Sequence, residues 1–330
     1  MGVMSRVMER LEAIYAISPT RVGGSAEEDA AHRLFAEWLE EAGLHVHVDA
    51  AGNTFGLRGE PAFWSGSHLD SVPHGGRFDG VLGVVAALEA ATRTEAPLAI
   101  VAFRDEERAY GGSRAFVERP VLPNAYVELH VEQGPMLERI GAPLGIVTAI
   151  VGQARGQVVI HGRADHAGTT SMEARDDALV KAAAFVLHVR DAARPGTVAT
   201  VGQVEVRPGV ANVVPELVTL SVDARASTTA ELDDLVSRIG FEPSRRHEPV
   251  AMSGAPLAAL RAAAPGAHEL VSGAGHDAAI LGAAGIPTGM LFVRSLNGGV
   301  SHSPAELSSE ADIALGIDAL TSAFDTLARI

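Results

Sequence analysis

The sequence has 330 residues, of which 47% are hydrophobic and 20% are charged, so the chain can bury a large core and is not disordered. Lys and Arg number 26 against 41 Asp and Glu, a formal net charge of −15 that argues against binding nucleic acid through its phosphates. The chain has no cysteine, which excludes disulfides, thiol nucleophiles and thiolate metal ligands. Any metal must therefore be held by His, Asp and Glu, and there are 13 histidines.

The N-terminal segment, residues 1–17, is charged and amphipathic, without the uninterrupted apolar stretch of a signal peptide. The longest apolar runs, such as Val81 to Leu88, are far shorter than the roughly 20 residues that span a bilayer. We therefore expect a soluble, cytoplasmic protein that does not bind a membrane.

Helical and strand patterns alternate in the first half of the chain. Apolar positions with a 3.6-residue period predict a surface helix at 26–42, and strand-like segments follow at 45–49 and 62–67. Residues 81–92 are typical of a buried helix, and residues 98–103 of a fully buried strand. Strand, helix and strand at this spacing indicate an α/β fold with a mostly parallel sheet.

The pattern changes after about residue 150. The pattern indicates strands at 157–162, 198–206 and 217–224 and helices at 176–190 and 231–239. This order is typical of an α+β insert with an antiparallel sheet. We expect an inserted domain at 151–252, which splits a catalytic domain into residues 1–150 and 253–330.

Metal-type ligands follow several of the predicted strands. His68 and Asp70 end an apolar stretch, and alternation places them on the same side of a strand. A carboxylate at this spacing can accept the second ring N–H of a ligand histidine and fix its tautomer. The alternative is a strand-end histidine with a helix-capping aspartate, and Asp79, just before the helix at 81–92, has the same alternative of an ordinary N-cap.

Three more segments carry such residues. The acids Asp105 to Glu107 directly follow a buried strand, which is costly without a compensating cation, although a solvated charge run is the alternative. His130 lies on an alternating strand with polar groups on one face, and His302 lies in a Gly-rich loop ahead of a helix. All would lie near the carboxyl ends of parallel strands, where α/β sheets place their sites.

Together these segments contain what a two-metal hydrolase requires: nitrogen and carboxylate ligands, a carboxylate able to bridge, and a free carboxylate to take a proton from water. The ligand candidates are His68, Asp79, Glu107, His130 and His302, and the free carboxylate is Glu106. Such ligands suit two divalent ions of zinc, manganese, cobalt or nickel.

Seven segments resemble, in family order, those of the N-carbamoyl-L-amino-acid hydrolase and allantoate amidohydrolase family, the hydantoinase/carbamylase branch of the M20-type metallopeptidases. They are GSHLDSVPHGGRFDG, FRDEERAYGGSRAF, ELHVEQGPMLE, ADHAGTTSMEARDDA, ANVVPELVTLSVDAR, SGAGHDAAIL and GGVSHSPAE. The resemblance covers nearly the whole chain. It implies a di-metal hydrolase domain that cleaves the carbamoyl or ureido C–N bond of a small molecule carrying a carboxylate.

The resemblance also implies how the metal ligands are shared. One metal ion would be held by His68 and His130 and a second by Glu107 and His302, with Asp79 as the bridge between them. A histidine at position 130, where the peptidase branch more often has a carboxylate, favours the carbamoylase branch.

The resemblance assigns further roles in catalysis and substrate binding. Glu106 would be the general base, Asp70 would orient His68, and His166 would hydrogen-bond the developing oxyanion. The implied substrate contacts are Gln133, Asn212, Arg225 and His276, with Arg225 as the clamp on a carboxylate. Considered alone, these residues allow structural alternatives: a loop histidine satisfied by backbone at 166, an Asx turn at 212, a helix cap at 276 and a surface ion pair at 225.

In this family the insert is a lid and dimerisation domain, so the resemblance also implies a homodimer. The chain is shorter than the family pattern at 116–126 and 226–256, which leaves lid geometry and substrate size open. Two other functions fit the same residues: an M20-type dipeptidase or N-acyl-amino-acid hydrolase, and a non-catalytic, metal-stabilised binding protein. The intact Glu106 argues against the binding protein, which has no use for a free carboxylate beside the metals.

Overall fold

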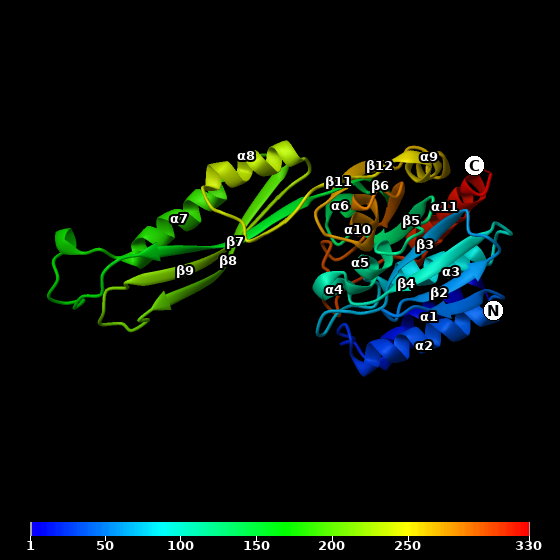
Figure 1. Ribbon diagram of the computed structural model, residues 1–330, viewed down its shortest axis with the longest axis horizontal. Helices are drawn as coiled ribbons and strands as arrows, with labels where there is room; N and C mark the ends of the chain where they lie inside the picture. Colours follow the sequence, from blue (N-terminus) through cyan, green and yellow to red (C-terminus); the bar gives the residue numbers. More distant parts are fainter. Residues whose placement is uncertain (1, 330) are drawn as a thin grey trace. The chain divides into compact units, whose positions relative to one another are not determined.

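The computed structural model describes residues 2–329, and they form two compact units (Figure 1). The first unit contains the chain before residue 151 and after residue 250, and the second is Val151–Val250. The boundary expected from the sequence is 252, but the chain joins the first unit earlier, because β11 (Val250–Ala251) already lies at the edge of the first unit's sheet.

Nine strands form the sheet of the first unit among the residues described. Their order is β1 (His45–Val48), β2 (Thr54–Arg58), β4 (Leu98–Phe103), β3 (Phe63–His68), β5 (Tyr126–Val131), β13 (Thr288–Val293), β6 (Leu144–Ile150) and β11, with β12 (His268–Ser272) also paired to β6. Neighbours among β4, β3, β5 and β13 run parallel, whereas the β1–β2, β2–β4 and β13–β6 pairs are antiparallel. The predicted α/β class with a largely parallel sheet is confirmed.

The helices of the first unit cover this sheet. They are α1 (Val3–Ile17), α2 (Ala26–Glu41), α3 (Val81–Ala91), α4 (Glu106–Ala109), α5 (Gly111–Val117), α6 (Met136–Ile140), α9 (Gly254–Ala263), α10 (Asp277–Ala283) and α11 (Glu310–Leu327). All 11 residues of α3 are buried, because this helix packs against β3 and β5 and also against α1 and α11. The helices predicted at 26–42 and 81–92 are confirmed as α2 and α3. No helix within residues 2–329 has both the length and the apolar character of a membrane span.

Five strands of this sheet escaped prediction, namely β2, β6, β11, β12 and β13, and the reason is visible in two of them. In β2 the central residue is Gly56, which interrupts the apolar pattern. A Cβ atom there would lie 2.5 Å from Leu39 Cδ2, so the glycine lets α2 pack closely on the strand. In β6 the first four residues are all buried, so the alternation that marks a half-buried strand is absent.

The parallel strands determine where the candidate ligands lie. In the register of β3 and β4, His68 is opposite Phe103, so both strands end at the same edge of the sheet. The segment that begins at Arg104 therefore leaves the sheet beside His68. β5, which also runs parallel to β3, carries His130 to this edge.

The second unit is a four-stranded antiparallel sheet with helices on it. The strand order is β10 (Arg245–His247), β7 (Gly152–His161), β9 (Leu217–Ala226) and β8 (Thr197–Arg207). A short 3₁₀ turn at Met172–Ala174 precedes α7 (Ala178–Ala192), and α8 (Thr229–Ile239) follows β9. Figure 1 shows α7 and α8 lying along this sheet, and the residues of β9 alternate between buried and half-buried because one face of the strand packs against these helices. The predicted antiparallel sheet is confirmed.

Candidate metal centre

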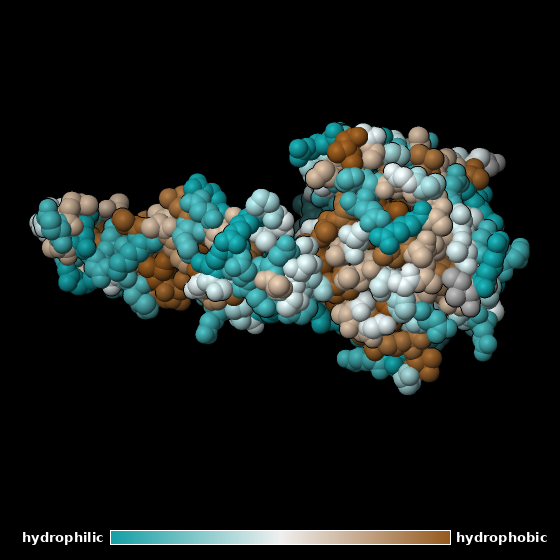
Figure 2. Space-filling model, turned by 90° about the horizontal axis from the view of Figure 1, so that it is seen from above, coloured by the Kyte–Doolittle hydropathy of each residue, from teal (hydrophilic) through white to brown (hydrophobic). Residues whose placement is uncertain are grey.

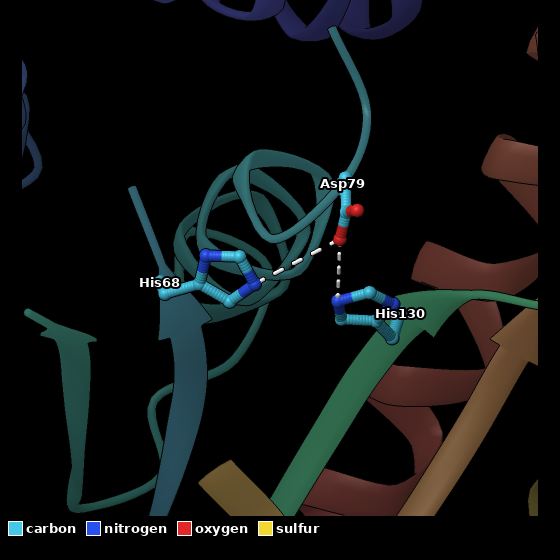
Figure 3. Close-up of side chains that lie close together, drawn as sticks. All are labelled: His68, Asp79 and His130. Carbon is cyan, nitrogen blue, oxygen red and sulfur yellow. Dashed lines mark ion pairs between the residues drawn. The ribbon is translucent and has the colours of Figure 1, made fainter. Parts of the chain in front are cut away.

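The first group of candidate ligands lies at the ends of two neighbouring strands. His68 ends β3, His130 lies in β5, and Asp79 lies in the loop before α3. Figure 3 shows both imidazole rings pointing toward one oxygen of Asp79; His68 Nε2 is 3.8 Å and His130 Nε2 is 3.3 Å from Asp79 Oδ1. One ligand atom from each residue lies within 4.8 Å of the others, and all three residues are buried. Two imidazole nitrogens and a carboxylate oxygen suit a divalent transition metal ion.

The remaining ring nitrogens have acceptors of their own. His130 Nδ1 is 2.9 Å from the carbonyl oxygen of Val131, and His68 Nδ1 is 3.2 Å from both the carbonyl oxygen and Oδ1 of Asp70. A ring N–H that donates to these oxygens places the proton on Nδ1 in the neutral ring. The Nε2 atom of each histidine then has a lone pair on the side of Asp79, as metal ligation requires, and in His130 this atom accepts the N–H of Gly80 at 3.3 Å.

A second group shares Asp79 with the first. His302 Nε2 lies 3.4 Å from Asp79 Oδ2 and 3.4 Å from Glu107 Oε2, and the three residues again offer ligand atoms within 4.8 Å of one another. Asp79 therefore presents one carboxylate oxygen to each group. Glu107 Oε1 is buried and has no hydrogen-bond partner, an unsatisfied state that a metal ion would relieve.

Asp79 does not cap the helix that follows it. The N-cap of α3 is Gly80, and no side chain accepts a hydrogen bond there. Asp79 Oδ2 instead accepts from Gln133 Nε2 at 2.8 Å, so the N-cap alternative for Asp79 is wrong. Gly80 has a φ of +66°, and a Cβ atom at this position would collide with the ring of His68. A glycine is therefore required for the loop to approach the ligand histidine so closely.

The acidic segment after β4 is held by Asp70. The backbone N–H groups of Glu106 and Glu107 donate to Asp70 Oδ1 and Oδ2, each at 3.1 Å. Glu106 is only 6% exposed, and its Oε2 lies 3.8 Å from His68 Nε2. The solvated charge run is therefore wrong for Glu106, which is a buried carboxylate beside both ligand groups and a member of neither.

Burial and neighbouring charges shift the pKa values of several side chains at this site. Burial raises the pKa of Glu106 well above its ordinary value, against the opposing effect of His68, and burial with the charge of Asp79 raises the pKa of Glu107 to about 7. The hydrogen bond to Asp79 raises the pKa of His302 to about 9. Burial also acts to raise the pKa of Asp79, but when the His130 and His302 rings also carry a proton on Nε2, their hydrogen bonds to Asp79 outweigh it and hold that pKa well below its usual range. Metal ligands must be deprotonated, so a divalent ion bound here would displace the protons of the candidate ligands. The imidazole and carboxylate groups present fit such an ion.

A third group of possible ligands lies behind the first. Glu128, His130 and His276 offer atoms within 4.8 Å of one another. The carboxylate of Glu128 already accepts from Ser67 Oγ at 2.8 Å and from the N–H of Ala278 at 3.0 Å. We therefore interpret Glu128 as a buried support that holds α10 against β5.

Comparison with known proteins places the chain in a family. Residues 64–326 match peptidase family M20/M25/M40. The chain belongs to this family. It is 38% identical to the N-carbamoyl-L-amino acid amidohydrolase of Geobacillus stearothermophilus and 34% identical to the allantoate amidohydrolase of Escherichia coli (strain K12), and each alignment covers 91% of both chains.

Solved structures agree with this placement. The crystal structure of an amidase of the hydantoinase/carbamoylase family from Burkholderia multivorans has a TM-score of 0.89 at 29% identity and covers 98% of both chains. The family resemblance found in the sequence is confirmed. These relatives identify the chain as an amidohydrolase of a metal-dependent family, and the described residues contain groups able to hold metal.

Two predicted site residues lie side by side in the second unit. His166 forms an isolated β-bridge with Val213, next to Asn212, and both His166 and Asn212 are exposed. His166 Nδ1 accepts from the N–H groups of Gly168 and Thr169 at 2.9 and 3.2 Å. Because Nδ1 is an acceptor, the proton of the neutral ring is on Nε2. The backbone therefore satisfies one nitrogen of His166 and leaves the other as an N–H donor.

Arg225, also in the second unit, is held by its own strand. Its Nε and Nη2 donate to the two oxygens of Asp223 at 3.1 and 3.2 Å, and Arg155 Nε donates to the same carboxylate at 2.8 Å. The ion pair considered as the alternative for Arg225 is therefore present, with Asp223 as its partner. Its side chain is 29% exposed.

Gln133 and His276 lie in the first unit, with different surroundings. Gln133 donates to Asp79, and its own Oε1 is buried without a hydrogen-bond partner. His276 is the N-cap of α10 but makes no side-chain capping bond, so the helix-cap alternative is wrong. Its ring centroid is 4.5 Å from that of His130, and its Nε2 is 3.0 Å from Ser272 Oγ. His276 is fully buried behind a ligand histidine.

Two residues that hold the site together were missed. Arg21 is fully buried; its Nε donates to the carbonyl oxygen of Leu69 at 2.9 Å, and its backbone N–H and C=O both bond to Ser71, so it holds the chain on either side of Asp70. No sequence pattern pointed to Arg21. Glu306 accepts hydrogen bonds from two ligand-bearing loops, and its place at the end of the His302 motif was the available signal.

Proposed function

We propose that the chain is a dinuclear metal-dependent amidohydrolase that cleaves the carbamoyl or ureido C–N bond of N-carbamoyl-L-amino acids or related ureido acids such as allantoate. The relatives that bear these names support the substrate class. The observation that carries the proposal is Glu106. It is a buried carboxylate whose Oε2 lies 3.8 Å from His68 Nε2, and it belongs to neither candidate ligand group. A general base must be a group of this kind.

The proposed ligands divide as the two groups do. His68 and His130 would hold one ion, Glu107 and His302 would hold the other, and Asp79 would contribute an oxygen to each. Bound divalent ions would act as Lewis acids that polarise a water molecule and the substrate carbonyl. The ligand types suit zinc, manganese, cobalt or nickel.

The remaining chemistry falls to the side chains of the chain itself. Glu106 takes a proton from the attacking water, whose oxygen bonds to the carbamoyl carbon, and it returns the proton to the amine that leaves when the C–N bond breaks. Asp70 supports this step because it holds the backbone of Glu106 and the ring of His68. An N-carbamoyl-L-amino acid would yield the amino acid, ammonia and carbon dioxide.

Substrate recognition is assigned to residues of both units. His166 would donate its Nε2–H to the developing oxyanion, which the tautomer set by its loop supports. In the first unit, Gln133 Oε1 is a buried acceptor without a partner and suits a ureido N–H. Arg225 would bind the substrate carboxylate, with Asn212 and His276 as further contacts.

The experiment is a substrate panel with metal-reconstituted protein, in which released ammonia and released free amino acid are both measured. We expect ammonia from N-carbamoyl-L-amino acids or allantoate, and no free amino acid from a dipeptide or an N-acetyl-L-amino acid. Chelator-treated protein is the matched control. Turnover of the dipeptide or the N-acetyl compound alone would establish the alternative hydrolase. Binding of a ureido acid without turnover of any compound would establish a binding protein.

We also infer that the second unit is a lid and dimerisation domain. Strand β8 ends its sheet, and an unpaired strand edge favours association with another chain. Apolar side chains are exposed on this strand and on α7, including Val198, Val204 and Leu187; Figure 2 shows hydrophobic residues among the hydrophilic ones on this unit, at the left. Light scattering should give a dimer mass for the wild type and a monomer mass for Val198→Asp/Val204→Asp. A monomeric wild type would contradict the inference.

A further inference from the structure

One carboxylate joins two distant loops beside the metal centre. Glu306 is 7% exposed, and its Oε2 accepts from the backbone N–H groups of Phe78 and Asp79 at 3.2 and 3.3 Å. Its Oε1 accepts from Ser301 Oγ at 2.9 Å and from the N–H of His302 at 3.2 Å. Each oxygen of Glu306 therefore holds one loop.

The two loops carry the candidate ligands that must meet at one ion. Asp79 and His302 are more than 220 residues apart in the sequence, yet His302 Nε2 lies 3.4 Å from Asp79 Oδ2. Ser301 Oγ also lies 3.3 Å from Asp79 Oδ2. The carboxyl group of Glu306 is rigid and planar, so it fixes the distance between the backbone atoms of the two loops.

The backbone on both sides is shaped for this contact. A Cβ atom on Gly76 would collide with the carboxylate of Glu306, so only glycine allows the first loop to lie so close. His302 has a φ of +55°, a left-handed conformation that is unfavourable for a residue with a side chain. The hydrogen bond from its N–H to Glu306 helps to hold His302 in this conformation. The backbone of both loops therefore adopts the conformation that the contact with Glu306 requires.

We propose that Glu306 is a positioning residue, which locks the two loops so that Asp79 and His302 face the same metal ion. The inference rests on the proposed dinuclear function and adds a residue to it. Glu306 points its oxygens at backbone donors, so it acts through the ligands and not as one of them. Its loss should weaken the ion held by Glu107 and His302 far more than the ion held by His68 and His130.

Metal titration of the apoprotein tests this without substrate. In Glu306→Gln an NH₂ group replaces one acceptor and faces backbone N–H donors, so one loop must shift. We expect the affinity for the ion held by His68 and His130 to stay within about threefold of the wild-type value. The affinity for the ion held by Glu107 and His302 should fall about 10- to 100-fold, the usual effect of losing residues that orient metal ligands. Glu306→Asp keeps the charge but is one methylene too short to reach both loops, so it should lose a similar amount.

Glu89→Gln is the matched control. Glu89 is a fully buried carboxylate of α3 in the same unit, and it joins two segments by accepting from Arg6 and Arg93. We expect this variant to lower the melting temperature and to leave both metal affinities unchanged. Should Glu306→Gln fail to fold, Glu306→Asp carries the same titration.

The outcomes separate the inference from the function on which it rests. If the wild type binds two ions and the Glu306 variants bind both as tightly as Glu89→Gln does, Glu306 only stabilises the fold and the inference is overturned. If Glu306→Asp retains both affinities while Glu306→Gln loses one, charge and not position is what matters, and the inference is again overturned. If the wild type itself binds fewer than two ions, the dinuclear function fails first. Selective loss of the second ion in both Glu306 variants supports the inference.

Discussion

The two units hold their chemically important residues in opposite ways. In the first unit the candidate ligands are mostly buried and support one another: Asp70 accepts from the backbone of Glu106 and from His68, and Asp79 lies between His130 and His302. In the second unit His166 is exposed in a loop, and Arg225 is half-buried on a strand and held by a carboxylate two residues away.

This difference separates function from stability in the second unit and couples them at the candidate metal ligands of the first. Changing a buried charge that others depend on alters both metal binding and folding. Changing an exposed residue usually changes stability by less than about 0.5 kcal/mol. Each prediction below therefore pairs an activity measurement with metal content, thermal stability or both.

The largest effect is expected for Asp79→Ala. Asp79 belongs to both candidate ligand groups, and its loss leaves His130 and His302 without the carboxylate that faces them. We expect metal content to fall from about two ions per chain to near zero, with activity no higher than that of chelator-treated wild type. Added metal should restore the treated wild type but not the variant. Two tightly bound ions in the purified variant would show that Asp79 is not a shared ligand.

Glu106→Gln should remove activity while it leaves the metals in place. Glu106 is outside both ligand groups, and loss of a general base costs on the order of 10²–10⁴ in kcat. Burial already raises the pKa of Glu106 well above its ordinary value, so the neutral amide should not lower the melting temperature. Metal analysis, calorimetry and kcat on the same preparation check this. Wild-type turnover would mean that another group is the base.

His166→Ala tests the second unit. Its Nε2–H is the expected oxyanion donor, and removal of one such donor costs about 10²–10³ in kcat. Because the side chain is exposed, the melting temperature and metal content should not change. His188→Ala, an exposed histidine of α7 in the same unit, is the control and should keep full activity. A large loss of stability in His166→Ala would contradict the contrast between the units.

The sequence predicted which candidate ligands lie together in the first unit because the residue types recur where strands end. Segments ending near His68 and Phe103, and the strand that carries His130, are apolar and then polar, and parallel strands bring such ends to one edge. The sequence could not distinguish a metal-ligating Asp79 from a helix N-cap, since both place an aspartate before a helix. The structure excludes the N-cap alternative, because Gly80, with a φ of +66°, takes the N-cap position itself.

Residues that support the site over long separations were beyond the reach of the sequence. Arg21 reaches Leu69 through one hydrogen bond and Ser71 through two, and Glu306 reaches Phe78 across 228 positions. Such contacts leave no periodic pattern, since they depend on how loops fold back on one another. Likewise, the contact of Arg225 with Asp223 follows from the geometry of β9 and could not be told in advance from a free clamp.

The smallest effect is expected for Arg225→Lys. Lysine keeps the charge but loses the planar, two-point contact with a carboxylate, so kcat/KM for a carboxylate substrate should fall about tenfold. A neutral amide analogue of that substrate should be poor for the wild type and should lose little more in the variant. Melting temperature should stay nearly constant, because a half-exposed ion pair contributes only about 0–1 kcal/mol.

Arg155→Lys is the control for Arg225→Lys. Arg155 donates to the same carboxylate, Asp223, from the neighbouring strand, and its side chain is 52% exposed. Both variants weaken the contact with Asp223. If Arg225 binds substrate, only Arg225→Lys should lower kcat/KM more for the carboxylate substrate than for the amide. Equal losses on the two substrates, or the same losses in Arg155→Lys, would make Arg225 a residue that only pairs with Asp223. Arg225 of the second unit would then not bind the substrate carboxylate.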